Sequence, residues 1–399
     1  MSSFDEELGQ GLAVLRQQGL LRELRRVESP AGTHIQMGGR TLLNFSSNDY
    51  LGLAGNPLLK QAAIQAVEKF GAGSGAARLV CGSLAPHHEL EETLAQFKGV
   101  EAALSFSTGY ATAIGTICAL LGKDDVIILD KLVHACIVDA ARLSGAKIRV
   151  FAHNNLENLE RLLKWANQIR TPKSRVQGRG RLLIVTESIF SMDGDAAPLG
   201  EIVALKEKHG ASLMVDEAHG TGLYGKNRRG LAEASGVSGR IEIQMGTLGK
   251  AVGAAGGYIC GSRVLVDFLV NRARSFIFST APVPAAAAAA TAGLRLIQSP
   301  EGEKRRKLLW QRVADLKSGI KNKKSKTPSA IIPVMVGDEA RAVAVSAALR
   351  EKGFFVPAIR YPTVARSKAR LRVTLTATHT AKEISLFTAS LNELVNRES

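Results

Sequence analysis

The sequence predicts an α/β protein with a large, mainly parallel central sheet covered by helices on both faces. Through the middle of the chain, short and almost continuously apolar runs alternate with longer helical patterns. Such alternation is typical of a parallel sheet whose two faces are both buried. Toward the C-terminus the apolar runs become sparser. With 399 residues, we expect a helical arm and strand over 1–45, a large domain over 46–290 and a small α+β domain over 291–399.

The individual elements follow from the apolar spacing. Residues 5–27 have the pattern of a helical arm, 41–45 that of a strand, and 58–70 and 87–97 those of helices. Buried strands are expected at the apolar runs 102–106, 126–129, 148–151, 182–186, 213–215 and 241–245. In the last part, 330–336 and 371–375 have the composition of strands. The basic, glycine-containing segment 171–180 is the best candidate for local mobility.

Composition excludes several classes of protein. Hydrophobic residues make up 45% and charged residues 22%, as in ordinary globular proteins. The acidic first ten residues do not form a signal peptide, and no run of about 18 apolar residues predicts a membrane span. The cysteines are too scattered for a zinc site and favour a reducing cytoplasm; they are Cys81, Cys118, Cys136 and Cys260.

The formal net charge of +16 is strongly basic. It favours an acidic partner such as a nucleotide thioester or an acidic carrier protein, but solvated helix faces also explain it. Residues 304–326, for example, have the spacing of a basic amphipathic helix. Nucleic-acid binding is an alternative from another class of function, although no basic segment with interleaved aromatics supports it.

Lys250 is the most informative residue. It ends the run 246–250, directly after an apolar strand pattern and next to several glycines. Burial disfavours the charged form of an ammonium and lowers its pKa. A lysine in this position can therefore act as an amine nucleophile and form a Schiff base.

Asp216 follows the apolar run 213–215, and His219 comes three positions later. Ligands of open α/β sheets bind outside the carboxyl ends of the strands. A carboxylate there can hold a proton on a ring nitrogen, as pyridoxal phosphate requires. The letters Asp-Glu-Ala-His also occur in helicases, but that interpretation needs an upstream phosphate-binding loop, and neither 220–227 nor 244–250 matches one.

Further polar residues follow the other expected strands. Gly109 and Tyr110 stand where a strand runs into a helix, a position whose free N–H groups can cradle a phosphate. His134 follows the run 126–129 and can lie over a planar ring. We therefore expect one group of residues at the carboxyl edge of the sheet, consisting of Gly109, His134, Glu187, Ser191, Asp216, His219, Thr247 and Lys250.

On these motifs the chain resembles the α-oxoamine synthases, a family of fold-type I pyridoxal phosphate enzymes. The segments that carry the resemblance are 44–53, 73–75, 190–195, 216–222 and 246–250. It implies that Lys250 binds the cofactor covalently and later moves the Cα proton, while Asp216 keeps the pyridine nitrogen protonated. It assigns the remaining cofactor contacts to His134, Glu187, Ser191, His219, Gly109, Tyr110 and Thr247.

The resemblance also implies a reaction in which an amino acid condenses with an acyl thioester and CO2 is lost. Segments 358–364 and 369–377 are most similar to the branch that joins L-alanine to a pimeloyl thioester, on coenzyme A or an acyl carrier protein, in biotin biosynthesis. Segments 246–251 and 330–335 are also similar to the branch that uses glycine and acetyl-CoA. No metal is expected.

Substrate contacts and a homodimer with shared active sites follow from the same resemblance. Arg372 corresponds to the family arginine that binds the amino-acid carboxylate, a task that suits its guanidinium group. The other expected substrate contacts are Asn48, Arg25 and Thr363, with His134. Ser279 and Thr280 are expected to reach the cofactor phosphate of a neighbouring subunit. Glu217 and Tyr110 stand where the family more often has Asp and Phe.

Overall fold

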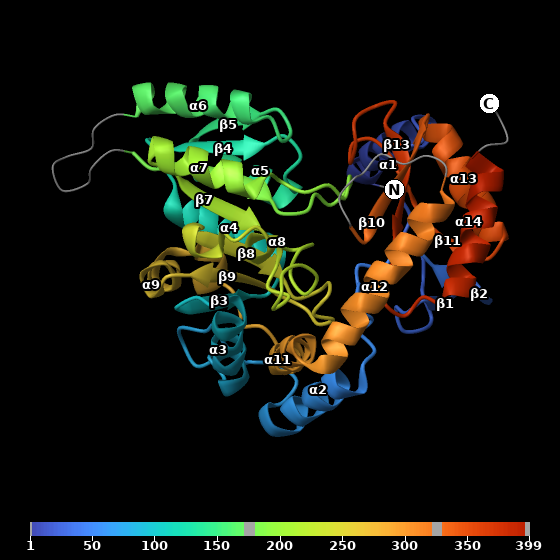
Figure 1. Ribbon diagram of the computed structural model, residues 1–399, viewed down its shortest axis with the longest axis horizontal. Helices are drawn as coiled ribbons and strands as arrows, with labels where there is room; N and C mark the ends of the chain where they lie inside the picture. The colour runs from blue at the N-terminus through green and yellow to red at the C-terminus, as the bar shows by residue number, and fades with distance from the viewer. Residues whose placement is uncertain (1, 171–179, 321–328, 396–399) are drawn as a thin grey trace.

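The computed structural model describes residues 2–170, 180–320 and 329–395. Its central feature is a seven-stranded sheet of order β3-β9-β8-β7-β6-β4-β5 (Figure 1). Six strands run in one direction, and only β9 is antiparallel to its two neighbours. The strands are β3 (Ala102–Phe106), β4 (Val126–Asp130), β5 (Lys147–Phe151), β6 (Leu182–Glu187), β7 (Ser212–Asp216), β8 (Ile243–Thr247) and β9 (Gly257–Gly261).

Both faces of this sheet are buried. Along β4, Ile127 and Leu129 belong to one apolar cluster and Val126 and Ile128 to another, as the two-residue repeat of a strand requires. The first cluster includes residues of α4 (Gly109–Leu120), α5 (Ala135–Ser144), α9 (Arg263–Arg272) and α10 (Arg274–Ile277). The second includes residues of α6 (Leu156–Ile169), α7 (Leu199–His209) and α8 (Leu231–Ala234). The predicted α/β class with a mainly parallel sheet is confirmed.

The remaining helices connect this sheet to a second region of the molecule. Helix α11 packs on α2 and α3, and α12 leads from there to the C-terminal part (Figure 1). The bounds are α2 (Pro57–Phe70), α3 (Ala85–Lys98), α11 (Pro284–Gln298) and α12 (Pro300–Gly319). No helix in the described ranges is both long and apolar enough to cross a membrane.

The second region holds two small sheets. One has the order β10-β13-β12, and the other joins the N-terminal β1 and β2 to β11 near the C-terminus. Helices α13 and α14 pack on each other beside these strands. The elements are β1 (His34–Met37), β2 (Arg40–Asn44), β10 (Ile331–Gly337), α13 (Glu339–Glu351), β11 (Phe354–Phe355), β12 (Ala358–Ile359), β13 (Ala369–Thr374) and α14 (Ala381–Val395).

Several element boundaries differ from the sequence-based expectation. The expected arm helix over 5–27 is wrong in length: α1 spans Ser3–Gln17 and ends before Gly19, whose φ of +65° leaves the helical region. Strands β1 and β9 were not predicted, since β1 is short and β9 begins in a glycine-rich run. The helix expected over 304–326 corresponds to α12, which ends at Gly319. Residues 321–326 of that expected helix lie outside the described ranges, as do residues 171–179 of the segment expected to be mobile.

Gly257 provides a test of how closely β9 approaches α4. A Cβ atom on Gly257 would lie 2.4 Å from Thr112 Oγ1 and 2.8 Å from the Cα and N atoms of Gly109. Because backbone atoms cannot move aside cheaply, we expect Gly257→Ala to lower the free energy of unfolding by about 1–3 kcal/mol. Thermal unfolding measures the change. Gly200→Ala is the matched control, since no atom lies within 4 Å of its Cβ position; equal stability of the two variants would contradict the close approach.

Candidate active site

The carboxyl ends of the parallel strands place most of the predicted residues at one edge of the sheet. Glu187, Asp216 and Thr247 are the last residues of β6, β7 and β8, and His134 follows β4 as the N-cap of α5. The register of β6 and β7 pairs Glu187 directly with Asp216. The predicted gathering of polar groups at this edge therefore follows from the strand directions.

Lys250 is held by a chain of hydrogen bonds that leads into the buried interior. Its Nζ lies 2.8 Å from His219 Nε2, and His219 Nδ1 lies 2.6 Å from the Tyr50 hydroxyl. That hydroxyl donates to Asn48 Oδ1 at 3.2 Å. Burial, followed by the charge of Lys250, holds the pKa of His219 well below its usual range. His219 is therefore a neutral ring whose Nε2 accepts a hydrogen bond from the Lys250 amine and whose Nδ1–H donates to the Tyr50 hydroxyl.

Two buried carboxyl groups surround the same lysine. Burial raises the pKa of Asp216, and the charge of Lys250 opposes that rise. Burial, then the charge of Asp216, raises the pKa of Glu187 to about 8. Burial lowers the pKa of Lys250, while Asp216 and Glu187 raise it. At neutral pH Glu187 is thus mostly protonated, while Asp216 and Lys250 each favour the charged form of the other against the effect of burial.

Arg372 connects the C-terminal sheet to this edge. From β13 its Nε donates to the carbonyl oxygen of Ser191 at 2.6 Å. Both terminal nitrogens donate to Asn48 Oδ1 at 3.1 Å. Asn48, Ser191 and Arg372 come from three distant parts of the sequence, and the structure brings them together as expected.

The phosphate-side residues lie around the start of α4. Thr108 caps this helix by accepting from the N–H of Ala111, and the first N–H groups of a helix have no intrahelical partner. Thr247 lies beside Gly109, where a Cβ would meet Thr247 Cβ at 3.7 Å. The Tyr110 hydroxyl donates to Asp139 Oδ2 at 2.7 Å, so its ring lies against α5. The N-terminus of α4 thus has the groups that bind an anion.

Arg25 and Thr363 line a separate cavity of about 550 Å³ that also includes Arg22, Arg350 and Arg360. Arg22 donates to Thr363 Oγ1 at 3.4 Å. Within the described contacts of this single chain, neither this pair nor Ser279 and Thr280 touches Lys250. Thr280 instead pairs with Ala77. A larger cavity of about 660 Å³ lies at the opposite edge of the sheet and is lined by none of the predicted site residues.

Some residues of the site were missed from the sequence. Tyr50 lies in the segment 44–53 that carries the family resemblance, but it was not assigned a role, although its hydroxyl holds His219. His153 and Arg370, which contact the loop that carries Ser191, were given no role, because a single polar residue in a loop (His153) or in a strand (Arg370) has no periodicity that marks it. Within the described residues, no group of three or more His, Cys, Asp or Glu side chains is placed to hold a metal ion.

The donor set fits the cofactor expected from the sequence. Asp216 uses one oxygen for the N–H of Ala218 at 2.9 Å, which leaves an acceptor for a protonated ring nitrogen. Glu187 has a buried Oε1 without a protein partner, although its Oε2 accepts from the N–H of Ser191. With the amine of Lys250 and the helix N-terminus at Gly109, these groups suit the nitrogen, oxygen and phosphate groups of pyridoxal phosphate.

Replacing Asp216 tests the coupling of these charges. Asp216→Asn removes a negative charge that raises the pKa of Lys250, so that pKa falls further below its usual value. When pyridoxal phosphate is added to the cofactor-free variant, the visible absorbance band should therefore appear at a lower pH than it does with the wild-type protein. Glu187→Gln is the control, with a smaller shift that appears only above about pH 8 because Glu187 is protonated below it. An unchanged profile for Asp216→Asn would contradict the coupling.

Comparisons with known proteins agree with this geometry. The aminotransferase class I and II family profile matches residues 40–391. An 8-amino-7-oxononanoate synthase of Geobacter sulfurreducens is 47% identical and covers 95% of both chains. A serine palmitoyltransferase of S. paucimobilis, solved with bound PLP and myriocin, superimposes with a TM-score of 0.88 at 31% identity and covers 98% of both chains.

A second solved structure, an 8-amino-7-oxononanoate synthase of Francisella tularensis, has a TM-score of 0.72 at 28% identity. It covers 88% of this chain and 97% of that chain. Since the family profile and the relatives extend over nearly the whole length, the chain belongs to the aminotransferase class I and II family.

Proposed function

We propose that this protein condenses L-alanine with a pimeloyl thioester, releasing CO2 and the free thiol carrier, to form 8-amino-7-oxononanoate for biotin biosynthesis. One observation carries the proposal. Eight relatives, all named 8-amino-7-oxononanoate synthase, are 43–50% identical to this protein over about 95% of the chain. The cofactor is pyridoxal phosphate, which supplies an electron sink for the electrons of the bonds broken at Cα.

Asp216 and Lys250 divide the proton chemistry between them. In the proposal Asp216 holds a proton on the cofactor's ring nitrogen, a task that requires its ionised form. Lys250 anchors the cofactor and, once displaced by the amino acid, takes the Cα proton with its amine. Because burial lowers the pKa of Lys250, a larger fraction of it is neutral and able to accept that proton.

The amino-acid carboxylate binds to Arg372. Its guanidinium is buried and already fixed by Asn48 and the carbonyl of Ser191, so little side-chain freedom is lost on binding. Fixing the carboxylate orients the Cα–H bond relative to the ring, and the same group is later lost as CO2. His134 is accessible at the N-terminus of α5, where its ring can stack on the cofactor.

The cavity around Arg25 and Thr363 is the proposed entry for the thioester. Its additional arginines, Arg22, Arg350 and Arg360, favour a negatively charged thioester carrier, and both coenzyme A and an acyl carrier protein are negatively charged.

The proposed location is the cytoplasm. The four cysteines are free thiols, which suits a reducing compartment.

The proposal includes a homodimer. Exposed apolar side chains flank the segment of Ser279 and Thr280: Phe278 is 70% exposed and Val80, near the Thr280 partner Ala77, is 78% exposed. Burial of such side chains favours association of two subunits. In that dimer Ser279 and Thr280 reach the cofactor phosphate of the neighbouring site.

Substrate choice is tested by steady-state kinetics with alanine and glycine, each combined with pimeloyl and acetyl thioesters. We expect the largest kcat/KM for alanine with the pimeloyl donor. Pimeloyl-CoA and pimeloyl-acyl carrier protein are compared in the same assay. Turnover confined to glycine and the acetyl donor would overturn the proposal in favour of a 2-amino-3-oxobutyrate ligase.

Lys250→Ala removes both the covalent anchor and the proton acceptor. We expect no cofactor mass on the protein after borohydride reduction and a loss of activity of about 10²–10⁴-fold from the proton transfer alone. Intact-mass spectrometry and the condensation assay measure the two effects. Lys307→Ala, which changes an exposed lysine of α12, is the control and should keep both properties. A reducible cofactor adduct on the Lys250→Ala protein would refute the assignment.

A further inference from the structure

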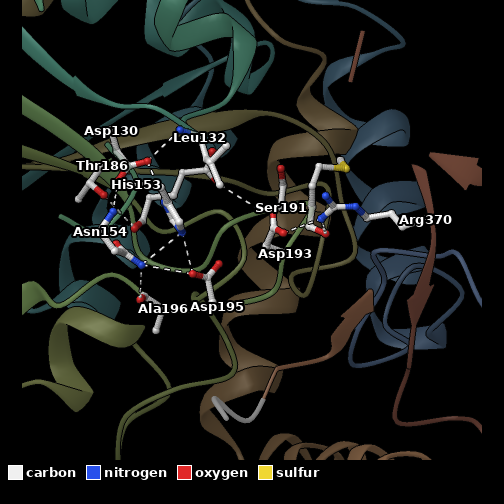
Figure 2. A network of polar contacts seen from close by, with 12 residues as sticks. Asp130, Leu132, His153, Asn154, Thr186, Ser191, Asp193, Asp195, Ala196 and Arg370 are labelled. Carbon is white, nitrogen blue, oxygen red and sulfur yellow. Dashed lines mark hydrogen bonds and ion pairs between the residues drawn. The ribbon is translucent and has the colours of Figure 1, made fainter. Parts of the chain in front are cut away.

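His153 is held between the carboxylates of Asp130 and Asp195 (Figure 2). Its Nδ1 lies 3.0 Å from Asp130 Oδ1 and its Nε2 lies 2.7 Å from Asp195 Oδ2. The Asp130 side chain is fully buried, and those of His153 and Asp195 are 23% and 32% exposed. Since an ionised carboxylate only accepts hydrogen bonds, both ring nitrogens carry a proton and the imidazole is a cation.

One end of this clamp fixes the segment that leads to His134. Asp130 is the last residue of β4, and its Oδ1 also accepts from the N–H of Leu132 at 2.8 Å. Its Oδ2 accepts from the N–H of Asn154 at 2.9 Å. Asp130 thus ties the turn after β4 to the loop after β5, in which His153 lies.

The other end fixes a tight turn over residues 190–195, here named the Ser191 turn. The N–H of Phe190 donates to the carbonyl of Asp195 at 3.0 Å, and the N–H of Gly194 donates to the carbonyl of Phe190 at 2.9 Å. Asn154 Nδ2 adds bonds to Asp195 Oδ2 at 3.2 Å and to the carbonyl of Ala196 at 3.1 Å. The Ser191 turn is therefore anchored to the large sheet through His153 and Asn154.

The opposite side of the Ser191 turn is bonded to the C-terminal sheet. Arg370 of β13 donates to Asp193 and to the carbonyl of Met192. Two residues along the same strand, Arg372 donates to the carbonyl of Ser191 at 2.6 Å. The Ser191 turn is thus held on one side by His153, from the loop after β5, and on the other side by β13, the strand that carries Arg372.

We propose that His153 is a positioning residue, which sets the Ser191 turn so that its carbonyl orients Arg372 toward the amino-acid carboxylate. The proposal rests on the function assigned above to Arg372. In this proposal His153 acts through Asp195 and the Ser191 turn rather than by direct contact with the amino acid. Its effect therefore falls on amino-acid binding, because the acyl-donor cavity around Thr363 shares no residue with the clamp.

His153→Gln tests this. A glutamine side chain is neutral and its single amide cannot donate to both carboxylates in the geometry of the ring, so the turn loses a charged hydrogen bond. We expect the KM for L-alanine to rise about tenfold, with kcat and the KM for the pimeloyl thioester within about threefold of wild type. Asp195→Asn removes the other partner and should give the same selective rise, and the double variant should add little to either.

His34→Gln is the matched control, because His34 forms an exposed contact with Glu383 at 3.3 Å and should leave all three constants unchanged. An unchanged KM for alanine in both His153→Gln and Asp195→Asn would overturn the proposal. Equal rises in the KM values of both substrates would also overturn it, since they indicate a general structural defect.

A second measurement does not depend on the reaction. Burial lowers the pKa of His153, but the hydrogen bonds and charges of Asp130 and Asp195 together raise it to about 10. The other groups that face the ring are neutral, namely the Asn154 amide and the edge of Phe190. The pKa of His153 thus rises on folding from about 6.5 to about 10. Its positive charge therefore stabilises the folded protein fully below about pH 6.5, and this stabilisation is lost as the pH rises through about 10.

The difference in melting temperature between wild type and His153→Gln should accordingly be constant up to about pH 6.5 and shrink toward pH 10. A pH-independent difference would overturn the charged clamp. Wild-type protein that is inactive with alanine would instead refute the proposed function, and the melting profile would still decide whether the clamp exists.

Discussion

The burial of several charges at one edge of the sheet is the constraint on which the site depends. Lys250, Asp216 and Glu187 are largely removed from water, and burial favours the neutral form of each; the charge of Lys250 opposes this for both acids, whereas the charge of Asp216 adds to it for Glu187. Lys250 lowers the pKa values of the two acids, and they raise its own. The hydrogen bonds of His219 and Tyr50 fix the position of the lysine within this set of charges.

Behind this set the loop that follows β7 is supported by a second buried pair. Glu217 accepts from the N–H groups of Leu231 and Ala232, and the fully buried Lys98 donates to Thr221 and to the carbonyl of Arg229. The charge of Glu217 raises the pKa of Lys98 against the effect of burial. Both ends of the segment 216–222, which carries Asp216 and His219, are therefore anchored by charge as well as by backbone bonds.

The strand-end residues were predictable because parallel strands bring their carboxyl ends to one edge, a rule that needs no knowledge of distant contacts. Asp216, Thr247 and Lys250 were found this way. Arg372 and Asn48 were assigned to the substrate site only by family resemblance, and neither their contact with each other nor the clamp of His153 was predicted, since contacts between distant residues have no local periodicity. Strand β9 was not predicted because the glycines at its two ends weaken the strand pattern. One of them, Gly257, is required by the close approach of β9 to Gly109.

The pairing of β2 with β11 has a consequence for synthesis of the chain. Asn48 and Arg372 are separated by 324 residues, and the two-stranded pair of β1 and β2 gains its third strand only at Phe354–Phe355. An isolated two-stranded hairpin is at best marginally stable in water. The N-terminal hairpin therefore lacks its third strand until residues 354–355 have been synthesised. In the same way Asn48 has no Arg372 to contact until β13 has been made, so a chain that ends before β13 contains Lys250 and Asp216 but lacks the arginine proposed to bind the amino-acid carboxylate.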